Sequence, residues 1–530
     1  MDKLSFDGPV VLAVLDGVGL APDSDGNAVS KARTPFLGKA SKKYPHLALD
    51  ASGLAVGLVD GQIGNSEVGH NTLGSGQIIK QGIARINEAF ESGEVFESTA
   101  WKGVISRIGS VGTLHFAGIF SDGGVHSDIS HLFKMIGRAY EEGIRKMRVH
   151  AIFDGRDVPP TSAIEYIKQF EDFASQFVDA DIKLASGGGR MVCVADRYEN
   201  DWNVVKSGFN MMKWGKAEYY FHSAEEGVSA LRREYTGVQD QNLPPFVIVD
   251  NSEKPVGTIE VGDALIYFDF RADRAIEIAQ AFTYWDFPYF ERGNYTPDDV
   301  YFVGMTEYNS DTHVPEHRLV EQIVISDTLS QFLGLHEVSQ LAVSETVKFG
   351  HITYYFNGNS YEKVSGEEHI QVDSYTEPFE TRPWMRSAEI TDAVISNLEK
   401  YKFVRLNYPG GDMVGHTADM NATIVAMEAI DLSLARLYQK VQELGGCLII
   451  VADHGNAEEL LDDGGRAKTA HTTNKVPCII CDDTVNRSRY ELASIMNPGL
   501  ANLAATIATL LGFNEYPKSW QESLIVVNKY

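Results

Sequence analysis

Short apolar runs alternate along the chain with longer segments of helical character, and this alternation constrains the fold more than any other feature. Apolar runs of strand length that are bounded by turn residues are typical of buried strands, and their alternation with helices is typical of α/β units around mostly parallel sheets. We therefore predict an α/β fold. The expected strands are Val10–Leu15, Leu114–Phe120, Arg148–Phe153, Phe246–Val249, Leu265–Phe270, Tyr301–Gly304, Phe403–Tyr408 and Cys447–Ala452.

Polar residues follow these runs at once. They are Asp16-Gly17, Ser121 to His126, Asp154 to Asp157, Arg271 to Arg274, Pro409 to Asp412, and Asp453-His454. In open α/β sheets, ligands bind outside the carboxyl ends of the strands, so these positions are where chemistry is expected.

The charge balance limits the possible partners. The chain has 46 Lys+Arg against 73 Asp+Glu, a formal net charge of −27, which argues against general binding of nucleic acids or of anionic membranes. No apolar run approaches the roughly 18 residues of a membrane span. We expect a monomeric cytoplasmic protein that acts on a small molecule, and any anionic substrate must be held by a local cluster of cations.

Only four cysteines occur, too few for a disulfide scaffold, which favours a reducing compartment. Cys478 and Cys481 form a C-x-x-C, which could indicate a redox or zinc site. They lie, however, in a short strand-like run whose period of two puts the sulfurs on opposite faces, and no second Cys pair completes a zinc site. We interpret them as buried strand cysteines.

Two glycine-rich segments resemble nucleotide-binding loops without matching them. Asp16-Gly-Val-Gly19 follows a strand, but Pro22 stands where a dinucleotide fingerprint needs its third glycine. Gly64 to His70 has P-loop glycine spacing but lacks the Lys and Ser/Thr that follow. Two alternatives remain open at each: Asp16 is a ligand or a turn cap, and Ser66 is a nucleophile at a helix start or a plain N-cap.

Aspartate and histidine residues form a candidate metal set. Asp412 and His416 are spaced i, i+4, a workable metal-ligand spacing on a helix, and Asp453-His454 end a buried strand, where desolvated polar groups need partners. His471 lies in a stretch without apolar periodicity. Such mixed O/N ligands suit a pair of divalent ions such as manganese. The full set is Asp16, Ser66, Asp412, His416, Asp453, His454 and His471.

The order of these residues predicts the domain organisation. Asp16 and Ser66 lie before residue 70 and the others beyond residue 410, so both ends of the chain should build one domain around an insertion. The insertion carries a second set: His126, Arg156, Asp157, Arg190, Arg197, Arg271 and Arg274. Arginine forks bind phosphate and carboxylate oxygens bidentately. The alternative is that these arginines are solvated surface residues.

Several blocks together resemble one family, the 2,3-bisphosphoglycerate-independent phosphoglycerate mutases, in a form like that of plants and trypanosomatids. They occur in family order and cover nearly the whole chain. The blocks are Leu15-Asp-Gly-Val-Gly19, Gly64-Asn-Ser-Glu-Val-Gly-His70, Ser121-Asp-Gly-Gly-Val-His126, Asp154-Gly-Arg-Asp157, Phe270-Arg-Ala-Asp-Arg274, Glu345-Thr-Val-Lys348 and Val451-Ala-Asp-His-Gly-Asn456. The resemblance implies a three-layer metal domain like that of alkaline phosphatase, residues 1–80 plus 316–530, with a second α/β substrate domain inserted at 81–315.

The resemblance also implies residue roles. Asp412, His416 and His471 would hold one metal ion, and Asp16, Ser66, Asp453 and His454 a second; manganese is expected, with magnesium or cobalt as alternatives. His126, Arg156, Asp157, Arg190, Arg197, Arg271, Arg274 and Lys348 would contact substrate. Ser66, Asp157 and Lys348 would be catalytic. Six residues separate Arg190 from Arg197, one more than in the bacterial form, so this pair departs from the bacterial spacing.

The implied reaction interconverts 3-phosphoglycerate and 2-phosphoglycerate in glycolysis and gluconeogenesis. It proceeds through a phosphoserine at Ser66, without added 2,3-bisphosphoglycerate. A metal-dependent phosphatase or a sugar-phosphate mutase of the same superfamily is the alternative. A binding protein that has lost catalysis is a further one, which the complete ligand set disfavours.

Overall fold

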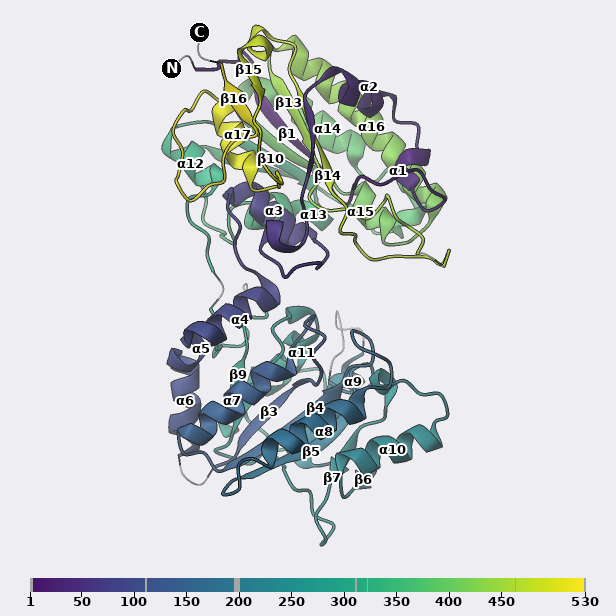
Figure 1. Ribbon diagram of the computed structural model, residues 1–530, viewed down its shortest axis with the longest axis vertical. Helices are drawn as coiled ribbons and strands as arrows, with labels where there is room; N and C mark the ends of the chain where they lie inside the picture. The colour runs from purple at the N-terminus through teal and green to yellow at the C-terminus, as the bar shows by residue number, and fades with distance from the viewer. Residues whose placement is uncertain are drawn as a thin grey trace. The chain divides into compact units, whose positions relative to one another are not determined.

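The chain divides into two compact units. The computed structural model describes residues 3–109, 112–194, 201–309, 312–321, 323–462 and 464–528. The first unit comprises Met1–Gln81 with Ile323–Tyr530, and the second comprises Gly82–Gln322 (Figure 1). The first unit is therefore assembled from two separate stretches of the chain, and the second from one.

The first unit is built on a seven-stranded sheet of order β11-β10-β12-β1-β13-β14-β2. Its strands run parallel from β11 to β13, whereas β14 is antiparallel to both of its neighbours. The strands are β1 Val10–Leu15, β2 His46–Leu49, β10 Gln340–Glu345, β11 Glu367–Val372, β12 Phe403–Tyr408, β13 Cys447–Val451 and β14 Val476–Cys481. A separate antiparallel pair joins β15 Tyr490–Leu492 and β16 Ile525–Val527.

Helices cover both faces of this sheet (Figure 1). On one face α14 packs with α16 and with β12, and on the other α17 packs with α3 and α12. The helices of the unit are α1 Ala28–Lys31, α2 Pro35–Lys43, α3 Ser66–Ser75, α12 Leu329–Leu335, α13 Thr346–Gly350, α14 Ser387–Ile395, α15 Gly410–Gly415, α16 Met420–Glu443 and α17 Asn502–Leu510. The predicted three-layer α/β architecture is confirmed.

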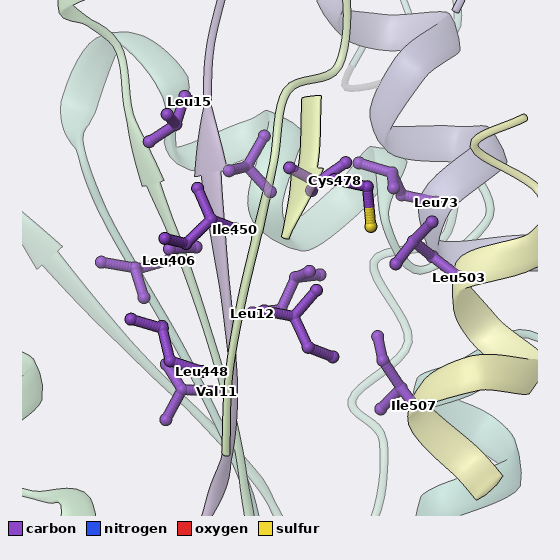
Figure 2. Packing of buried hydrophobic residues seen from close by; sticks show 14 of the residues in the cluster. Val11, Leu12, Leu15, Leu73, Leu406, Leu448, Ile450, Cys478, Leu503 and Ile507 are labelled. Carbon is purple, nitrogen blue, oxygen red and sulfur yellow. The ribbon is translucent and has the colours of Figure 1, made fainter. Parts of the chain in front are cut away.

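Alternate residues of the buried strands supply the core on each face. Figure 2 shows Leu12 on the side of Leu503 and Ile507 of α17, while its neighbour Val11 lies on the opposite side with Leu448. Every residue of β1 is buried, as expected for a strand covered by helices on both faces.

The cysteine interpretation is confirmed. In β14, Cys478 pairs with Val451 and Cys481 with Leu448, positions an odd number of residues apart, so the two sulfurs lie on opposite faces of the sheet. All four cysteines are free and buried.

The second unit contains another seven-stranded sheet, of order β6-β7-β5-β4-β3-β8-β9. All pairs are parallel except β5 with β7. The strands are β3 Leu114–Ile119, β4 Lys146–Phe153, β5 Asp181–Gly189, β6 Tyr219–Phe221, β7 Phe246–Ile248, β8 Ala264–Tyr267 and β9 Tyr301–Gly304. The helices are α4 Gly82–Ser92, α5 Glu94–Glu97, α6 Thr99–Ile108, α7 Ile129–Glu141, α8 Ala163–Ala174, α9 Trp202–Trp214, α10 Ala224–Glu234 and α11 Ile276–Thr283.

Three of the predicted strands, β3, β7 and β13, end one residue early, and β8 ends three residues early. The sequence predicts a strand to Phe270, whereas β8 ends at Tyr267. Beyond it, the side chain of Asp269 accepts a hydrogen bond from the backbone N–H of Ile119 at 2.7 Å, in place of a ladder carbonyl. The chain therefore leaves the sheet at the point where a carboxylate replaces the backbone. Among the described helices, none has the length and apolar character needed to cross a bilayer.

Candidate active site

The first candidate site lies at the carboxyl ends of three neighbouring strands of the first unit. Asp16 directly follows β1, Asp453 and His454 follow β13, and Asp412 lies in α15, just after β12. Parallel strands end at a common edge, so the sheet itself brings these residues together.

Ser66 is at the centre of this cluster. Its Oγ lies 3.0 Å from Asp16 Oδ1, 2.9 Å from His454 Nε2 and 2.5 Å from Lys348 Nζ. The reading of Ser66 as a plain N-cap is wrong: Asn65 caps α3 by accepting from the Val68 N–H, and Ser66 is the first helical residue. The hydroxyl is thus directed at charged groups and is not used to start the helix.

A second cluster forms around Asp412. Its Oδ1 lies 3.0 Å from His471 Nε2 and 3.2 Å from His416 Nε2, and the two imidazole nitrogens are 3.0 Å apart. The short helix α15 places Asp412 and His416 on one face, as the i, i+4 spacing predicts. His471 comes from an irregular segment before β14.

Backbone carbonyls orient the histidines. Nδ1 of His416 lies 2.6 Å from the Thr469 carbonyl oxygen, and Nδ1 of His471 lies 2.8 Å from that of Gly64. A carbonyl can only accept, so each Nδ1 carries a proton, and Nε2 is the ring nitrogen that faces the cluster and can bind a metal ion. Hydrogen bonds of this kind commonly fix metal-binding imidazoles.

The donor set fits divalent metal ions. Ligand atoms of Asp412, His454 and His471 all lie within 4.8 Å of one another, and so do those of Asp16, Asp453 and His454. Asp453 Oδ2 is buried and accepts no hydrogen bond from the described residues, although His70 Nδ1, which is directed at the Ser66 carbonyl, lies 3.2 Å away. A buried carboxylate oxygen without a donor is costly, and a cation would compensate it. The sequence assigned His454 to one metal site only. In the structure His454 belongs to both groups of ligand atoms, and His416 lies next to Asp412 of the first group.

The cluster is strongly coupled electrostatically. Burial opposes ionisation of Asp16, but the charge of Lys348 and a hydrogen bond from His454 outweigh it and lower the pKa of Asp16. Burial likewise opposes the charge on Lys348, yet Asp16 and Asp412 raise its pKa. Burial lowers the pKa of His454, but the nearby Asp453 and Asp16 outweigh burial and raise that pKa to about 9. Without metal, the site thus holds cationic Lys348 and His454 against its carboxylates.

Asn407 and His70 support this centre, and the sequence analysis missed both. The Asn407 amide donates to Asp16 Oδ2 at 2.7 Å, and its nitrogen lies 3.0 Å from His70 Nε2. Nδ1 of His70 lies 2.8 Å from the Ser66 carbonyl oxygen, one turn earlier in α3. The available signal for Asn407 was a polar amide near the end of a predicted strand, because such an amide needs partners when it is buried.

The second candidate site lies at the carboxyl ends of the central strands of the second unit. His126 follows β3, Arg156 and Asp157 follow β4, Arg190 follows β5, and Arg271 and Arg274 follow β8. These strands are neighbours in the order β5-β4-β3-β8. Arg197 lies outside the described residues.

The predicted arginines differ in exposure and pairing. Arg190 is buried and ion-paired with Asp154 at 2.7 Å and with Asp157 at closer range. His126 Nε2 lies 3.8 Å from Asp157 Oδ2. Arg156 and Arg271 are exposed, and Arg274 is buried. Arg190 therefore orients Asp157 as much as it offers a cation, whereas Arg156 and Arg271 are accessible to an anion.

Comparison with known proteins gives consistent matches over nearly the whole chain. The family model of the metalloenzyme superfamily matches residues 8–515. The chain is 42% identical to a probable 2,3-bisphosphoglycerate-independent phosphoglycerate mutase of Leptospira interrogans, over 97% of either sequence. It is 39% identical to 2,3-bisphosphoglycerate-independent phosphoglycerate mutase 1 of Arabidopsis thaliana, over 99% of this chain and 97% of that one.

A solved structure is similar as well. The phosphoglycerate mutase of Leishmania mexicana, crystallised at low cobalt concentration, matches with a TM-score of 0.75 at 38% identity. The match covers 100% of this chain and 99% of the other. The predicted resemblance to plant and trypanosomatid forms is confirmed, and the match to Leptospira extends it to a bacterium.

Proposed function

The chain belongs to the metalloenzyme superfamily and, within it, to the 2,3-bisphosphoglycerate-independent phosphoglycerate mutases, and we propose that it interconverts 3-phosphoglycerate and 2-phosphoglycerate through a phosphoserine at Ser66. This reaction is an isomerisation of glycolysis and gluconeogenesis that needs no added 2,3-bisphosphoglycerate. The observation that carries the proposal is the Ser66 hydroxyl, which lies within hydrogen-bond distance of Asp16, His454 and Lys348 in one buried cluster.

Membership in a metalloenzyme family indicates binding of divalent metal ions. We propose two ions and manganese as the metal. Asp412, His416 and His471 would hold one, and Asp16, Ser66, Asp453 and His454 the other. Bound there, divalent ions would lower the pKa of the serine hydroxyl and offset charge on phosphoryl oxygens. His454 reaches both ligand groups, which supports a site in which two ions lie close together.

The chain's own residues prepare Ser66 for attack. A serine hydroxyl is a weak nucleophile at neutral pH and needs an activating partner. Lys348, held as a cation by Asp16 and Asp412, donates to Ser66 Oγ and would stabilise negative charge there and on the incoming phosphoryl group. Because Ser66 begins α3, the backbone N–H groups of the first turn favour a phosphate on its oxygen.

The second unit would bind the rest of the substrate. We propose that Arg156, Arg271 and Arg274, together with Arg190 and Arg197, bind the carboxylate and phosphate of phosphoglycerate. Asp157 would move protons on and off the glycerate hydroxyls, and His126 would orient it. The ion pair between Arg190 and Asp157 supports this, because it fixes the carboxylate that must carry the proton.

The decisive experiment measures mutase turnover on 3-phosphoglycerate without added 2,3-bisphosphoglycerate, with released inorganic phosphate measured alongside. Formation of 2-phosphoglycerate that far exceeds release of phosphate is expected. Release of phosphate without isomerisation would instead indicate a phosphatase, an alternative that the similar proteins do not favour. We further propose a cytoplasmic location, which the four free cysteines support.

A further inference from the structure

A buried glutamate outside every ligand set lies behind the metal-binding residues. Glu458 follows Asp453 by five positions and is 1% exposed. Its carboxylate accepts four hydrogen bonds. Oε2 accepts from the backbone N–H groups of Gly19 at 2.8 Å and Asn456 at 2.9 Å. Oε1 accepts from the Thr472 hydroxyl and from the Asn474 amide, the latter at 3.0 Å.

These donors come from three segments of the chain that each carry proposed metal ligands. Gly19 follows Asp16 after β1, and Asn456 follows His454 after β13. Thr472 and Asn474 lie one and three positions after His471. A single carboxylate thus connects segments that are far apart in the sequence and meet only at this site.

The surroundings of Glu458 also explain two glycines. A Cβ at Gly19 would lie 2.3 Å from Glu458 Oε1, and a Cβ at Gly455 would lie 2.3 Å from the same oxygen. The carboxylate cannot move aside without losing its four hydrogen bonds. The glycines that end Asp16-Gly-Val-Gly19 and follow Asp453-His454 therefore leave room for this glutamate.

We propose that Glu458 is a positioning residue that holds the three ligand-bearing segments in the geometry that binds metal. It does not itself bind an ion, because its carboxylate lone pairs are taken by the four donors. The proposal rests on the ligand assignment of the proposed function. Its consequence is a metal affinity that depends on Glu458, since outer partners of metal ligands typically contribute about 10- to 100-fold to affinity.

Glu458→Gln is the informative variant because it keeps the shape of the side chain. The backbone N–H groups of Gly19 and Asn456 can only donate, so the amide oxygen must face them. The amide nitrogen then faces Thr472 and Asn474, whose hydroxyl and amide groups can turn to accept. We expect the segment that carries His471 to loosen most.

The test compares metal-free wild type, Glu458→Gln and Glu459→Gln. Glu459 offers a matched control: its side chain pairs with Lys468 and accepts from the Asn474 amide, but bonds to none of Gly19, Asn456 and Thr472. Calorimetric titration with Mn²⁺ should give an affinity about 10- to 100-fold weaker for Glu458→Gln and close to wild type for Glu459→Gln. Titration with Co²⁺ should show a changed visible absorption band only in Glu458→Gln.

Kinetics separate positioning from a general structural defect. At saturating Mn²⁺, the kcat of Glu458→Gln should recover most of the wild-type value while the KM for 3-phosphoglycerate stays unchanged. A misfolded variant would not be rescued by metal, and circular dichroism of the metal-free protein checks its fold. If Glu458→Gln does not fold, Thr472→Val removes one of the four hydrogen bonds and should still weaken Mn²⁺ binding.

Either of two results would overturn the proposal. The first is a folded Glu458→Gln variant with unchanged metal affinity and an unchanged Co²⁺ spectrum. The second is an equal loss of Mn²⁺ affinity in Glu459→Gln, which would indicate an effect of charge alone. Failure of the proposed function is a distinct outcome. Wild-type protein would then bind metal without mutase turnover, and the affinity difference between the variants would remain.

Discussion

Lys348 Nζ lies 2.5 Å from Ser66 Oγ, although 282 positions separate the two residues in the sequence. The same ammonium lies 2.7 Å from Asp412 Oδ2 and 3.1 Å from Asp16 Oδ1. The lysine is therefore held as a cation beside the oxygen that we propose as the nucleophile.

Ser66→Ala should abolish isomerisation and leave the fold intact, because it removes one oxygen from the cluster. Loss of a nucleophile typically costs a factor on the order of 10⁴ or more in kcat. Turnover of 3-phosphoglycerate is measured, together with trapping of labelled phosphoserine at Ser66 in the wild type. Ser75→Ala, in the last turn of the same helix, is the matched control. Substantial turnover by Ser66→Ala would exclude the phosphoserine mechanism.

Lys348→Met should lower kcat by about 100- to 1000-fold, the usual effect of removing one group that stabilises transition-state charge. The variant leaves Asp16 and Asp412 without their cation, so its affinity for Mn²⁺ should rise or stay unchanged. Lys475→Met removes a lysine that pairs with Asp50 elsewhere in the unit and should behave like wild type. An unchanged kcat in Lys348→Met would rule out the catalytic role.

Metal binding should release protons at neutral pH. The pKa of His454 is raised to about 9 in the metal-free protein, above its ordinary value of about 6.5, so His454 is protonated at pH 7.5. Metal needs the neutral imidazole, so roughly one proton should be released from His454 per chain loaded. A pH-indicator dye in weak buffer measures this release. The apparent affinity should rise with pH up to about 9.

The same shift predicts how stability depends on pH. Because the pKa of His454 is higher in the folded protein than in the unfolded chain, protonation of His454 stabilises the metal-free fold. This contribution is fully present at a pH below the unfolded-state pKa and is lost as the pH rises through about 9. Denaturation of metal-free protein at pH 6.5 and at pH 9.5 tests the sign. His454→Gln should remove the part of the pH dependence that is due to this residue. A metal-free protein that becomes more stable between pH 6.5 and pH 9.5 would contradict the raised pKa of His454.

Chelator-treated protein should be inactive and should regain activity with Mn²⁺. Metal analysis should find about two ions per chain, by analogy with two-metal phosphoryl-transfer sites. Full activity of verified metal-free protein would refute the proposal that the enzyme needs two bound metal ions.

Arg271→Ala should harm isomerisation without changing metal content, because Arg271 belongs to the unit that carries none of the proposed metal ligands. A charge-assisted hydrogen bond contributes about 1.5–3 kcal/mol, so kcat/KM should fall roughly 10- to 100-fold. More phosphoserine should be lost to water, because glycerate escapes before it is rephosphorylated. Arg233→Ala, at an exposed position of α10, is the control. Loss of metal, or normal activity, in Arg271→Ala would be inconsistent with its proposed role.

The strands that the sequence predicted are those with continuous apolar runs. β1, β9 and β12 have the predicted bounds. A turn-forming residue stands at or just after the end of each, namely Asp16, Gly304 and Pro409. The strands missed include β5, whose carboxyl half is Ala185-Ser-Gly-Gly-Gly189, and β10, which carries Gln340 and Glu345 at its ends. In both, tertiary pairing outweighs a weak local preference for the strand.

The candidate site was predictable where residues follow strands, and less so elsewhere. Asp16, Asp412 and Asp453 could be located from the apolar runs before them. Asn407 left a weaker signal, a polar amide inside a strand-like run. Glu458 could not be located, because its role depends on contacts between distant segments that no spacing in the sequence reveals. The pairing of Arg190 with Asp154 and Asp157 was likewise hidden, since it joins the loops after two different strands.

The position of β1 between β12 and β13 has a consequence for the order of events during synthesis. An early strand must wait for partners that lie beyond residue 400, whereas Gly82–Gln322 is contiguous and can fold as soon as it leaves the ribosome. Val10–Leu15, apolar throughout, stays unpaired in that interval and is exposed to chaperones and to aggregation. The proposed metal ligands come together only after His471 has emerged, so under this assignment the nascent chain cannot bind metal until it is nearly complete.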